Sequence, residues 1–576
     1  MVLRRFKFKK LIKISLILSC VVLGYSCGKS QQSQEDATFS TGEVISIRPQ
    51  KRSKSVQLFK LSSPPLLKVT KNDNGVVKID EKSKESLLKE QEAFLKAAME
   101  IDPDIKVIYK YKMVLNAFAL LVDPDTQQKL SKLPYIKGLE KEGRFARAFI
   151  NKTVDPKEGD GPENKFLNLK DKNSVRFINA HKVHESLKVT SVNGEEKAVR
   201  GQGMKVGIID SGIDYTHSML GGVGTVEAYK EVDPNLPSDQ FPNQKVVGGI
   251  DLVGSAYNLS SSDPEKRIPQ PDKNPIDESG HGTHVAGTVA GIGDGTKTYS
   301  GVAPDASLHA IKVFGKNGST GDTVVIAGLE YAADPNGDLN LDDQLDVVNL
   351  SLGGGYGEPH SLYREAVKNL VEGGTVVVAS AGNAGHSPYI VGSPSTSDEA
   401  ISVAASVDDM THNIEFEASS FKGIDGFSLL VEVVQGNISR PIGNSDSNPL
   451  ELVYIKGNAE ADKDYSEEEA LMLKDKVAVI DRGKVSFIDK LKRAFKAGAK
   501  GALVVNNNPG SPIMMGGLGK VDFPAIMISQ SHGDILKGEM EKGSVSLQFR
   551  ADKKIIKSEL IDSLTGFSSR GPRSID

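Results

Sequence analysis

The chain has 576 residues, enough for several domains, and its 25% charged and 38% hydrophobic residues are the balance of a soluble globular protein. Its net charge of −4 is too close to neutral to favour nucleic acid, so we expect no nucleic-acid partner. The two cysteines, Cys20 and Cys27, lie close to the N-terminus, which excludes a disulfide or a thiolate metal site from the rest of the chain.

The N-terminus combines a basic stretch with a short apolar run at residues 14–23, too short for a comfortable membrane span. The run leads into Leu-Gly-Tyr-Ser-Cys, which ends at Cys27. This pattern resembles a bacterial lipoprotein signal, which implies a signal peptide at residues 1–27, lipidation of Cys27, and export with a lipid anchor to a membrane. The alternatives are a plain secretory signal with an incidental cysteine, or lipidation at Cys20, which would leave an apolar tail exposed.

Residues 28–65 are rich in Ser, Gln and Lys without an apolar period, which predicts a flexible tether. The pattern changes over residues 66–150. Apolar periodicity predicts a helix, then a strand pair, a second helix and a closing strand, at residues 83–100, 106–122, 126–133 and 136–140. The order indicates a small βαββαβ module of the ferredoxin-like α+β type.

Three stretches of this module, KEQEAFLKAAM, VIYKYKMVLNAFALLV and LSKLPYIKGLEKE, resemble the inhibitory propeptide of subtilisin-like proteases. The resemblance implies a domain that assists folding and blocks the cleft until it is cut off, so the chain's own propeptide would be a partner. A small accessory domain is the alternative. Residues 151–171 form a polar linker of the kind in which proteolytic cleavage concentrates.

A predicted strand at residues 204–209 leads into Asp210 within VGIIDSGIDYTH, and His281 begins the helix-like HGTHVAGTVAG. Together they resemble the subtilisin family, in which Asp, His and Ser occur in that order. The resemblance implies an α/β fold, a parallel sheet with helices on both faces, whose first part is residues 172–423. Asp210 would orient the imidazole, and His281 would be the general base. We expect His284 to be buried, and both His284 and His217 to be structural.

Two further segments match the same family. In DVVNLSLGG, the resemblance implies that Ser351, Leu352 and Gly353 pair through their backbone with an extended protein or peptide substrate. In GTVVVASAGN, it implies that the side-chain amide of Asn383 stabilises the oxyanion. Four motifs in family order make an incidental turn asparagine an unfavourable alternative.

The acidic run at residues 334–342 alternates oxygen-bearing side chains, and its weak calcium candidates are Asp334, Asn336, Asp338 and Asp342. Gly337 lies one place early for an EF-hand, and Leu345 stands where a bidentate acid belongs. A solvated acidic turn is therefore the favoured interpretation. Structural calcium is possible, and no cofactor is required for catalysis.

Residues 424–553 resemble a protease-associated domain inserted in the protease. The likeness rests on a strand that ends in Asp481-Arg482-Gly483, an amphipathic helix, and a Leu-Val-Val strand. The resemblance implies an influence on substrate access and no catalytic residues. At residues 554–576 the protease pattern resumes with GFSSRGP.

The 576 residues contain no Gly-Thr-Ser-Met-Ala segment, which is where the family places its nucleophile. We interpret the sequence as that of an exported serine endopeptidase truncated before its serine, and we expect the chain alone to be inactive with an exposed apolar face. The alternatives are an inactive binding or decoy module and a surface adhesion protein on the same fold. Intact Asp210, His281 and Asn383 favour the protease.

Overall fold

The computed structural model describes most of the chain from residue 54 to residue 573. The stretches that it leaves out within this range are 74–75, 141–143, 148–173, 192, 294–299, 355–360, 386, 410–414, 444–445, 447, 484, 508–509, 517–518 and 551–552. The predicted signal peptide, Cys27 and the whole predicted linker at residues 151–171 therefore lie outside the described residues. Among the described helices, none is both long enough and apolar enough to cross a membrane.

The N-terminal domain is a four-stranded sheet of order β4-β5-β1-β6 with two helices. Asp80 and Asp123 cap these helices by accepting hydrogen bonds from backbone N–H groups, and the rings of Phe59, Phe94 and Phe118 pack at tilted angles in the core. The bounds are β1 Ser55–Leu61, α1 Glu81–Ile101, β4 Lys106–Tyr111, β5 Ala117–Val122, α2 Pro124–Leu130 and β6 Ile136–Glu140, with η1 Leu66–Val69 and the hairpin β2 Thr70–Asp73 and β3 Val76–Ile79.

The elements follow the predicted βαββαβ order, but the predicted tether boundary at residue 65 is wrong. Strand β1 lies inside the region expected to be flexible, and it pairs with β5 on one side and β6 on the other. Lys60 interrupts the apolar residues of β1 where the register of its pairing with β6 shifts. The strand's sequence pattern is therefore hard to distinguish from the polar stretch before it.

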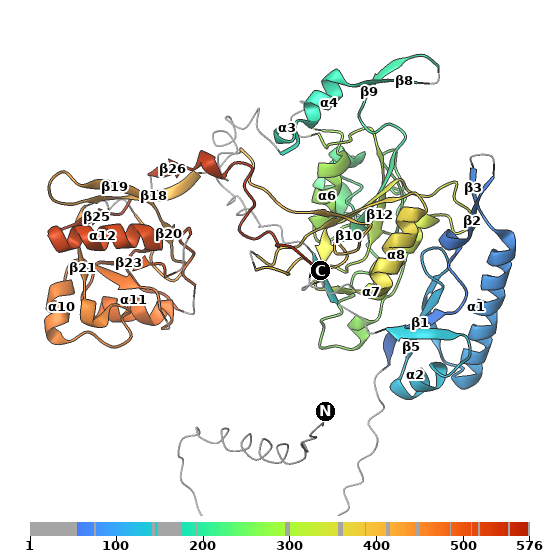
Figure 1. Cartoon of the computed structure of the whole chain (residues 1–576), viewed down its shortest axis with the longest axis horizontal. Helices are drawn as coiled ribbons and strands as arrows, with labels where there is room; N and C mark the ends of the chain where they lie inside the picture. Colours follow the sequence, from blue (N-terminus) through green and yellow to red (C-terminus); the bar gives the residue numbers. More distant parts are fainter. Residues whose placement is uncertain are drawn as a thin grey trace, which may run out of the picture. The chain divides into compact units, whose positions relative to one another are not determined.

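The central sheet has the order β11-β12-β10-β14-β16-β17, and every neighbouring pair is parallel. Helix α6 packs on the face that carries Val206 and Ile208, while α7 and α8 cover the face of Ile209, Val348 and Ala379 (Figure 1). Helices on both faces agree with the predicted α/β class. The bounds are β10 Lys205–Asp210, β11 Val246–Asp251, α6 His281–Ala290, β12 Ser307–Lys312, α7 Asp322–Ala333, β14 Val347–Leu350, α8 Ser361–Glu372, β16 Val376–Ser380 and β17 Ile401–Val403.

The remaining elements of this region are short and connect or flank the sheet. They are β7 Arg144–Arg147, α3 Ser174–Phe177, α4 Ala180–Ser186, β8 Lys188–Thr190, β9 Glu196–Ala198, η2 Ser218–Leu220, α5 Val226–Lys230, η3 Glu265–Arg267, β13 Thr320–Gly321, β15 Leu352–Gly353 and η6 Ser558–Leu560.

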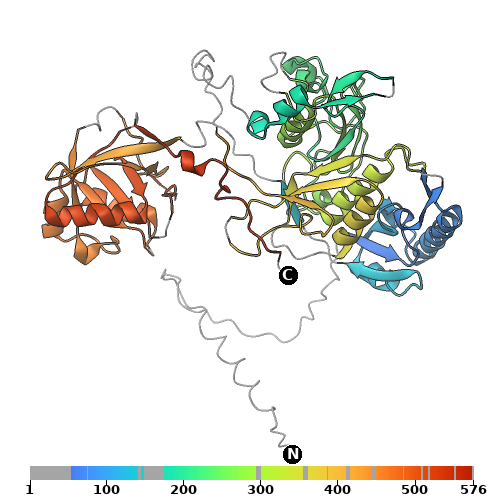
Figure 2. The ribbon, with the colours of Figure 1, turned by 45° about the horizontal axis from the view of Figure 1, so that its top comes forward.

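The insert is a separate layer of strands with α11 and α12 packed on opposite faces (Figure 2). Strand β18 pairs with β19, β25 and β26, so the insert spans residues 415–556. The predicted limits of 424 and 553 are therefore too narrow. The bounds are β18 Glu415–Lys422, β19 Ser428–Glu432, β20 Val434–Gln435, β21 Leu450–Tyr454, η5 Lys456–Asn458, α10 Glu467–Leu473, β22 Val477–Asp481, α11 Phe487–Lys496, β23 Gly501–Val505, β24 Ala525–Ile528, α12 Gln530–Lys542, β25 Ser546–Gln548 and β26 Lys554–Ile556.

Candidate active site

Asp210 and His281 meet at the carboxyl edge of the central sheet, where functional groups of open α/β sheets gather. Asp210 is the last residue of β10 and has no exposed surface, and His281 opens α6 with 8% of its surface exposed. The Nδ1 atom of His281 lies 2.7 Å from Oδ1 of Asp210, which also accepts a hydrogen bond from the backbone N–H of Ser211. The carboxylate therefore fixes which imidazole nitrogen points away from it.

A second carboxylate holds the start of α6 against the end of β10. Oδ1 of Asp277 accepts a hydrogen bond from the Ser211 hydroxyl, and Oδ2 accepts from the backbone and the hydroxyl of Thr283. The Ser211 hydroxyl oxygen in turn accepts from the N–H of Gly282 at 2.9 Å. These bonds determine where His281 sits relative to Asp210. Sequence reasoning missed Asp277, because it lies between Ile276 and Glu278, ahead of the stretch that begins at Gly280.

Charged residues stand at the carboxyl ends of the neighbouring strands β12 and β11. In the strand register, Lys312 at the end of β12 lies opposite Asp210 on one side and Asp251 on the other. Burial raises the pKa of Asp251, and the Lys312 ammonium acts against that shift. Burial also raises the pKa of Asp272, which pairs with Asp251 through the backbone, to about 6. The site is therefore rich in carboxylates around one lysine.

Asn383 follows β16 in an exposed turn on the same edge of the sheet. The turn contains Gly382, whose φ of +104° favours glycine, and a Cβ there would come within 2.9 Å of Ser569 Oγ. The Ser569 hydroxyl accepts from the N–H of Ala384 at 3.0 Å, and the Ser569 N–H donates to the carbonyl of Gly382. Ser569, which belongs to the protease pattern that resumes after the insert, thus holds the turn that presents Asn383.

The segment Ser351-Leu352-Gly353 continues from β14, the neighbour of β10. Its strand β15 pairs antiparallel with β7, so that Leu352 lies opposite Arg147 and Gly353 opposite Ala146. On its other edge, β7 pairs with β13 through Phe145 and Arg144. The tail of the N-terminal domain thus forms the middle strand between two strands of the α/β domain, and the predicted substrate strand is engaged through its backbone.

The α/β domain matches a known protein family over most of its length. A sequence profile of the subtilase family matches residues 201–574, which include the central sheet, Asp210, His281 and Asn383.

The chain belongs to the subtilase family.

Curated relatives agree with this membership of the subtilases. The chain is 34% identical over 373 residues to the minor extracellular protease Vpr of Bacillus subtilis, which covers 65% of this chain and 39% of Vpr. It is 36% identical over 214 residues to subtilisin DY of Bacillus licheniformis, or 37% of this chain and 59% of that protein. A PII-type proteinase of Lacticaseibacillus paracasei is 31% identical over 335 residues, or 54% of this chain and 16% of that protein. The match thus spans less than two thirds of each relative.

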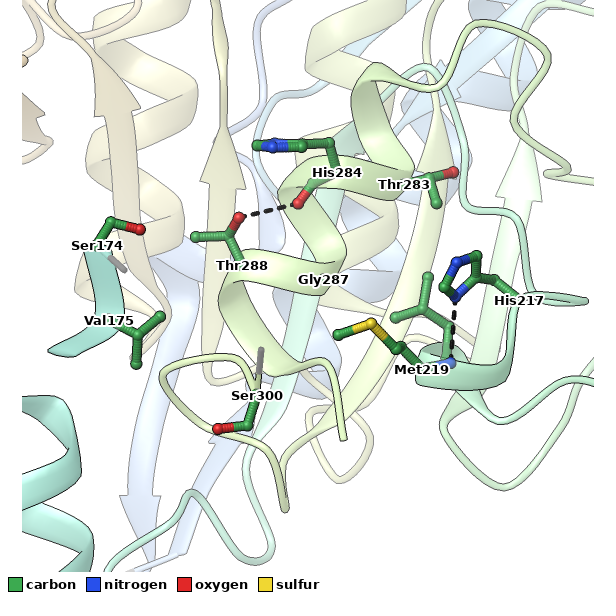
Figure 3. A pocket seen from close by; sticks show the side chains of 10 residues that line it. Ser174, Val175, His217, Met219, Thr283, His284, Gly287, Thr288 and Ser300 are labelled. Atoms are coloured by element: carbon green, nitrogen blue, oxygen red, sulfur yellow. Dashed lines mark hydrogen bonds between the residues drawn. The ribbon is translucent and has the colours of Figure 1, made fainter. Parts of the chain in front are cut away.

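The prediction that His284 is buried is wrong. Its side chain is exposed, and with His217 it lines a pocket of about 370 Å³ between α3, α6 and η2 (Figure 3). His217 accepts a hydrogen bond from the N–H of Met219 through Nδ1, which is a local capping role at η2. His284 lies three positions along α6 from His281, on the adjoining part of the helix surface, which faces solvent.

The acidic loop after α7 uses its carboxylates to organise its own backbone. Both oxygens of Asp334 accept hydrogen bonds from backbone N–H groups, those of Gly337, Asp338 and Leu339. Asp338 accepts from the N–H of Asn340 in the same way. Among the described residues, no three His, Cys, Asp or Glu side chains converge as a metal site would require. Hydrogen bonds to the loop's own backbone thus engage the carboxylates of Asp334 and Asp338.

We expect calcium removal to leave the stability of the chain unchanged. The hydrogen bonds to Asp334 already satisfy the carboxylate that would lead the ligand set, so a chelator should not remove a stabilising contact. Thermal denaturation with and without EGTA measures this directly. A melting temperature that falls with chelator, and is restored by added calcium, would instead establish a calcium site in the chain, and an Asp334→Ala variant would show whether this loop provides it.

Proposed function

We propose that the chain carries the Asp and His of an exported serine endopeptidase that hydrolyses peptide bonds through an Asp-His-Ser triad. The observation that carries this proposal is the buried 2.7 Å contact between Asp210 and His281 at the carboxyl edge of a parallel sheet. In this mechanism Asp210 orients the imidazole through Nδ1. His281 then removes the proton of a serine hydroxyl through Nε2 and later donates it to the leaving amine.

The position of His281 suits a general base. It occupies the first turn of α6, where the positive end of the helix dipole disfavours a protonated imidazole. The Asn383 amide would donate a hydrogen bond to the oxyanion as negative charge develops on the substrate oxygen. Ser351, Leu352 and Gly353 would align the substrate by the backbone pairing that β15 makes with β7.

The N-terminal domain would act as an inhibitory propeptide. Its strand β7 pairs on both edges with the α/β domain, which is how a peptide substrate would be held, so substrate and β7 would compete for one place. The domain is anchored by Tyr111, whose hydroxyl donates to the carbonyl of Thr323 at 2.7 Å, and by apolar residues shared with the α/β core. Cleavage in the linker that follows β7 would release it.

The serine would come from a segment outside the 576 residues, which hold no Gly-Thr-Ser-Met-Ala sequence. One face of the central sheet supports this proposal. On β16, Val377 is buried against α8, but Val376 points to the other face of the sheet. Val376 is 44% exposed, and on β17 Ile401 is 53% and Val403 48% exposed. A helix that covered these apolar side chains would complete the sheet and could present a serine to His281.

Export and the role of the insert complete the proposal. The N-terminal basic and apolar pattern with Cys27 supports a lipoprotein signal, and the name of one relative describes it as extracellular. The insert, with its Asp481-Arg482-Gly483 strand end, would act as a protease-associated domain that influences substrate access. Protein or peptide substrates follow from the family.

A second candidate function is a catalytically inactive binding or decoy module, or a surface adhesion protein. The observation that favours it is the backbone pairing of β15 with β7, since binding an extended segment in this way needs no nucleophile. Such a module would hold peptides at β15 without cleaving them.

A hydrolysis assay separates the two functions. The 576-residue chain should not hydrolyse a casein or peptide substrate, whereas the chain extended by a serine-bearing segment from a subtilase such as subtilisin DY should do so after its N-terminal domain is removed. The matched control carries alanine in place of the added serine. Peptide binding without hydrolysis by the extended protein would support the binding module, and hydrolysis by the unextended chain would show that the proposed nucleophile is wrong.

A further inference from the structure

We propose that Lys312 is a positioning residue for His281, which it serves by anchoring the loop before α6 and by offsetting the negative charge around the imidazole. This inference rests on the proposed function, since it concerns the same Asp210–His281 pair. Neither motif of the site contains Lys312, and in the strand SLHAIK its position at the strand end is where an ordinary solvated lysine would stand.

Lys312 is a buried cation between carboxylates. Its side chain has no exposed surface, and its Nζ lies 3.1 Å from Oδ2 of Asp251 and 3.3 Å from Oε2 of Glu278. Asp251 is equally buried, and Glu278 is 12% exposed. A charge removed from water at this depth is costly unless its partners compensate it, so the three groups hold one another in place.

Glu278 connects this ion pair to the loop that carries His281. It lies three positions before the histidine and directly after Asp277, which binds Ser211 and Thr283. The loop is therefore fixed at two adjacent residues, by Asp277 to β10 and α6, and by Glu278 to the end of β12. Loss of the second anchor would leave Asp277 alone to determine the approach of His281 to Asp210.

The same geometry gives Lys312 an electrostatic role. Six carboxylates lie on the segments next to His281, and the neighbouring imidazole on its own helix is His284. The carboxylates are Asp210 on β10, Asp214 after β10, Asp251 on β11, and Asp272, Asp277 and Glu278 on the loop before α6. Negative charge stabilises imidazolium, whereas a general base must be neutral. Lys312 is the cation that the described contacts place among these groups, so it works with the helix dipole to keep His281 unprotonated.

The test is an NMR titration of the full chain with ¹³Cε1-labelled histidine, in which a His281→Gln variant assigns the signal. Lys312→Gln should raise the titration midpoint of His281, on the order of one pH unit, because it removes an interior positive charge near the imidazole. Glu278→Gln should lower it, and Lys312→Arg should leave it near the wild-type value. The control is Lys245→Gln, because Lys245 is a buried lysine before β11 that binds carbonyls of Pro304 and Ala306 rather than carboxylates.

Opposite shifts for Lys312→Gln and Glu278→Gln would support the inference, because a merely structural residue would not produce them. An unchanged midpoint in both variants would overturn it. If Lys312→Gln does not fold, the loop variant Glu278→Gln and the charge-conserving Lys312→Arg decide the outcome. The titration needs no turnover, so a failure of this inference is distinguishable from a failure of the proposed peptidase function, which the hydrolysis assay measures.

Discussion

In the serine-extended protein, replacing His281 with alanine is expected to lower kcat on the order of 10⁶-fold, the loss typical of removing the base from a serine-protease triad. Asp210→Asn should cost about 10⁴-fold, because the amide cannot stabilise the imidazolium or hold the same tautomer. The 2.7 Å contact between the two side chains makes these losses non-additive, so the double variant should be little worse than His281→Ala. Steady-state hydrolysis of a chromogenic peptide provides the measurement.

The matched control is His284→Ala. His284 lies one turn along the same helix, but it is exposed and lines the outer pocket with His217. Its replacement should leave kcat within a few-fold of the parent. A loss for His284→Ala as large as that for His281→Ala would mean that the wrong histidine has been assigned the role of base.

Replacing Glu330 with alanine is expected to loosen the N-terminal domain by on the order of 3 kcal/mol. The carboxylate of Glu330 on α7 accepts hydrogen bonds from the backbone N–H groups of Lys112, Met113 and Val114, at 2.5 to 2.9 Å. Alanine would leave these donors without their acceptor at the interface. Hydrogen exchange of the peptide that contains them should become about 100-fold faster. Glu365→Gln is the control, since its ion pair with Lys60 is partly exposed and should be worth less than about 1 kcal/mol.

The carboxyl group of Glu330 also predicts that docking of the N-terminal domain depends on pH. Burial raises the pKa of Glu330 to about 7 from the usual 4.5, against the effect of the three N–H donors. Between pH 4.5 and pH 7, Glu330 therefore holds a proton when the N-terminal domain is docked and releases it when the domain is undocked. Docking should be tightest below pH 4.5 and weaken as the pH rises through 7. Exchange of the same peptide measured from pH 5 to pH 8, corrected for intrinsic rates, should show this trend, and Glu330→Ala should remove it. A trend that persists in the variant would assign it to another group.

The sequence predicted the parts of the site that are encoded by local motifs. Asp210 at a strand end and His281 at a helix start are both readable because each lies in a stretch whose glycines and apolar residues permit one local structure. The two residues are 71 positions apart in the sequence. Their contact follows from the parallel sheet and is present in the structure. The α/β class with helices on both faces was predictable for the same reason.

The parts that failed depend on contacts between distant segments. A lysine at the end of β12 and a glutamate in α7 have ordinary sequence surroundings, and only the fold brings Lys312 to Asp251 and Glu330 to backbone groups more than 200 positions earlier. The limits of the tether and of the insert were wrong because β1 and β18 pair with strands that lie far along the chain. His284 was misplaced because helical periodicity alone does not show which side faces solvent.

The central claim is that the Asp210–His281 pair can activate a serine supplied from outside the 576 residues. Its most direct test is covalent labelling by a serine-directed fluorophosphonate, measured by intact mass after removal of the N-terminal domain. The serine-extended protein should gain one label per chain at the added serine, while its His281→Ala variant and the unextended chain should gain none. Labelling of the added serine at the same rate in the His281→Ala variant would contradict the account.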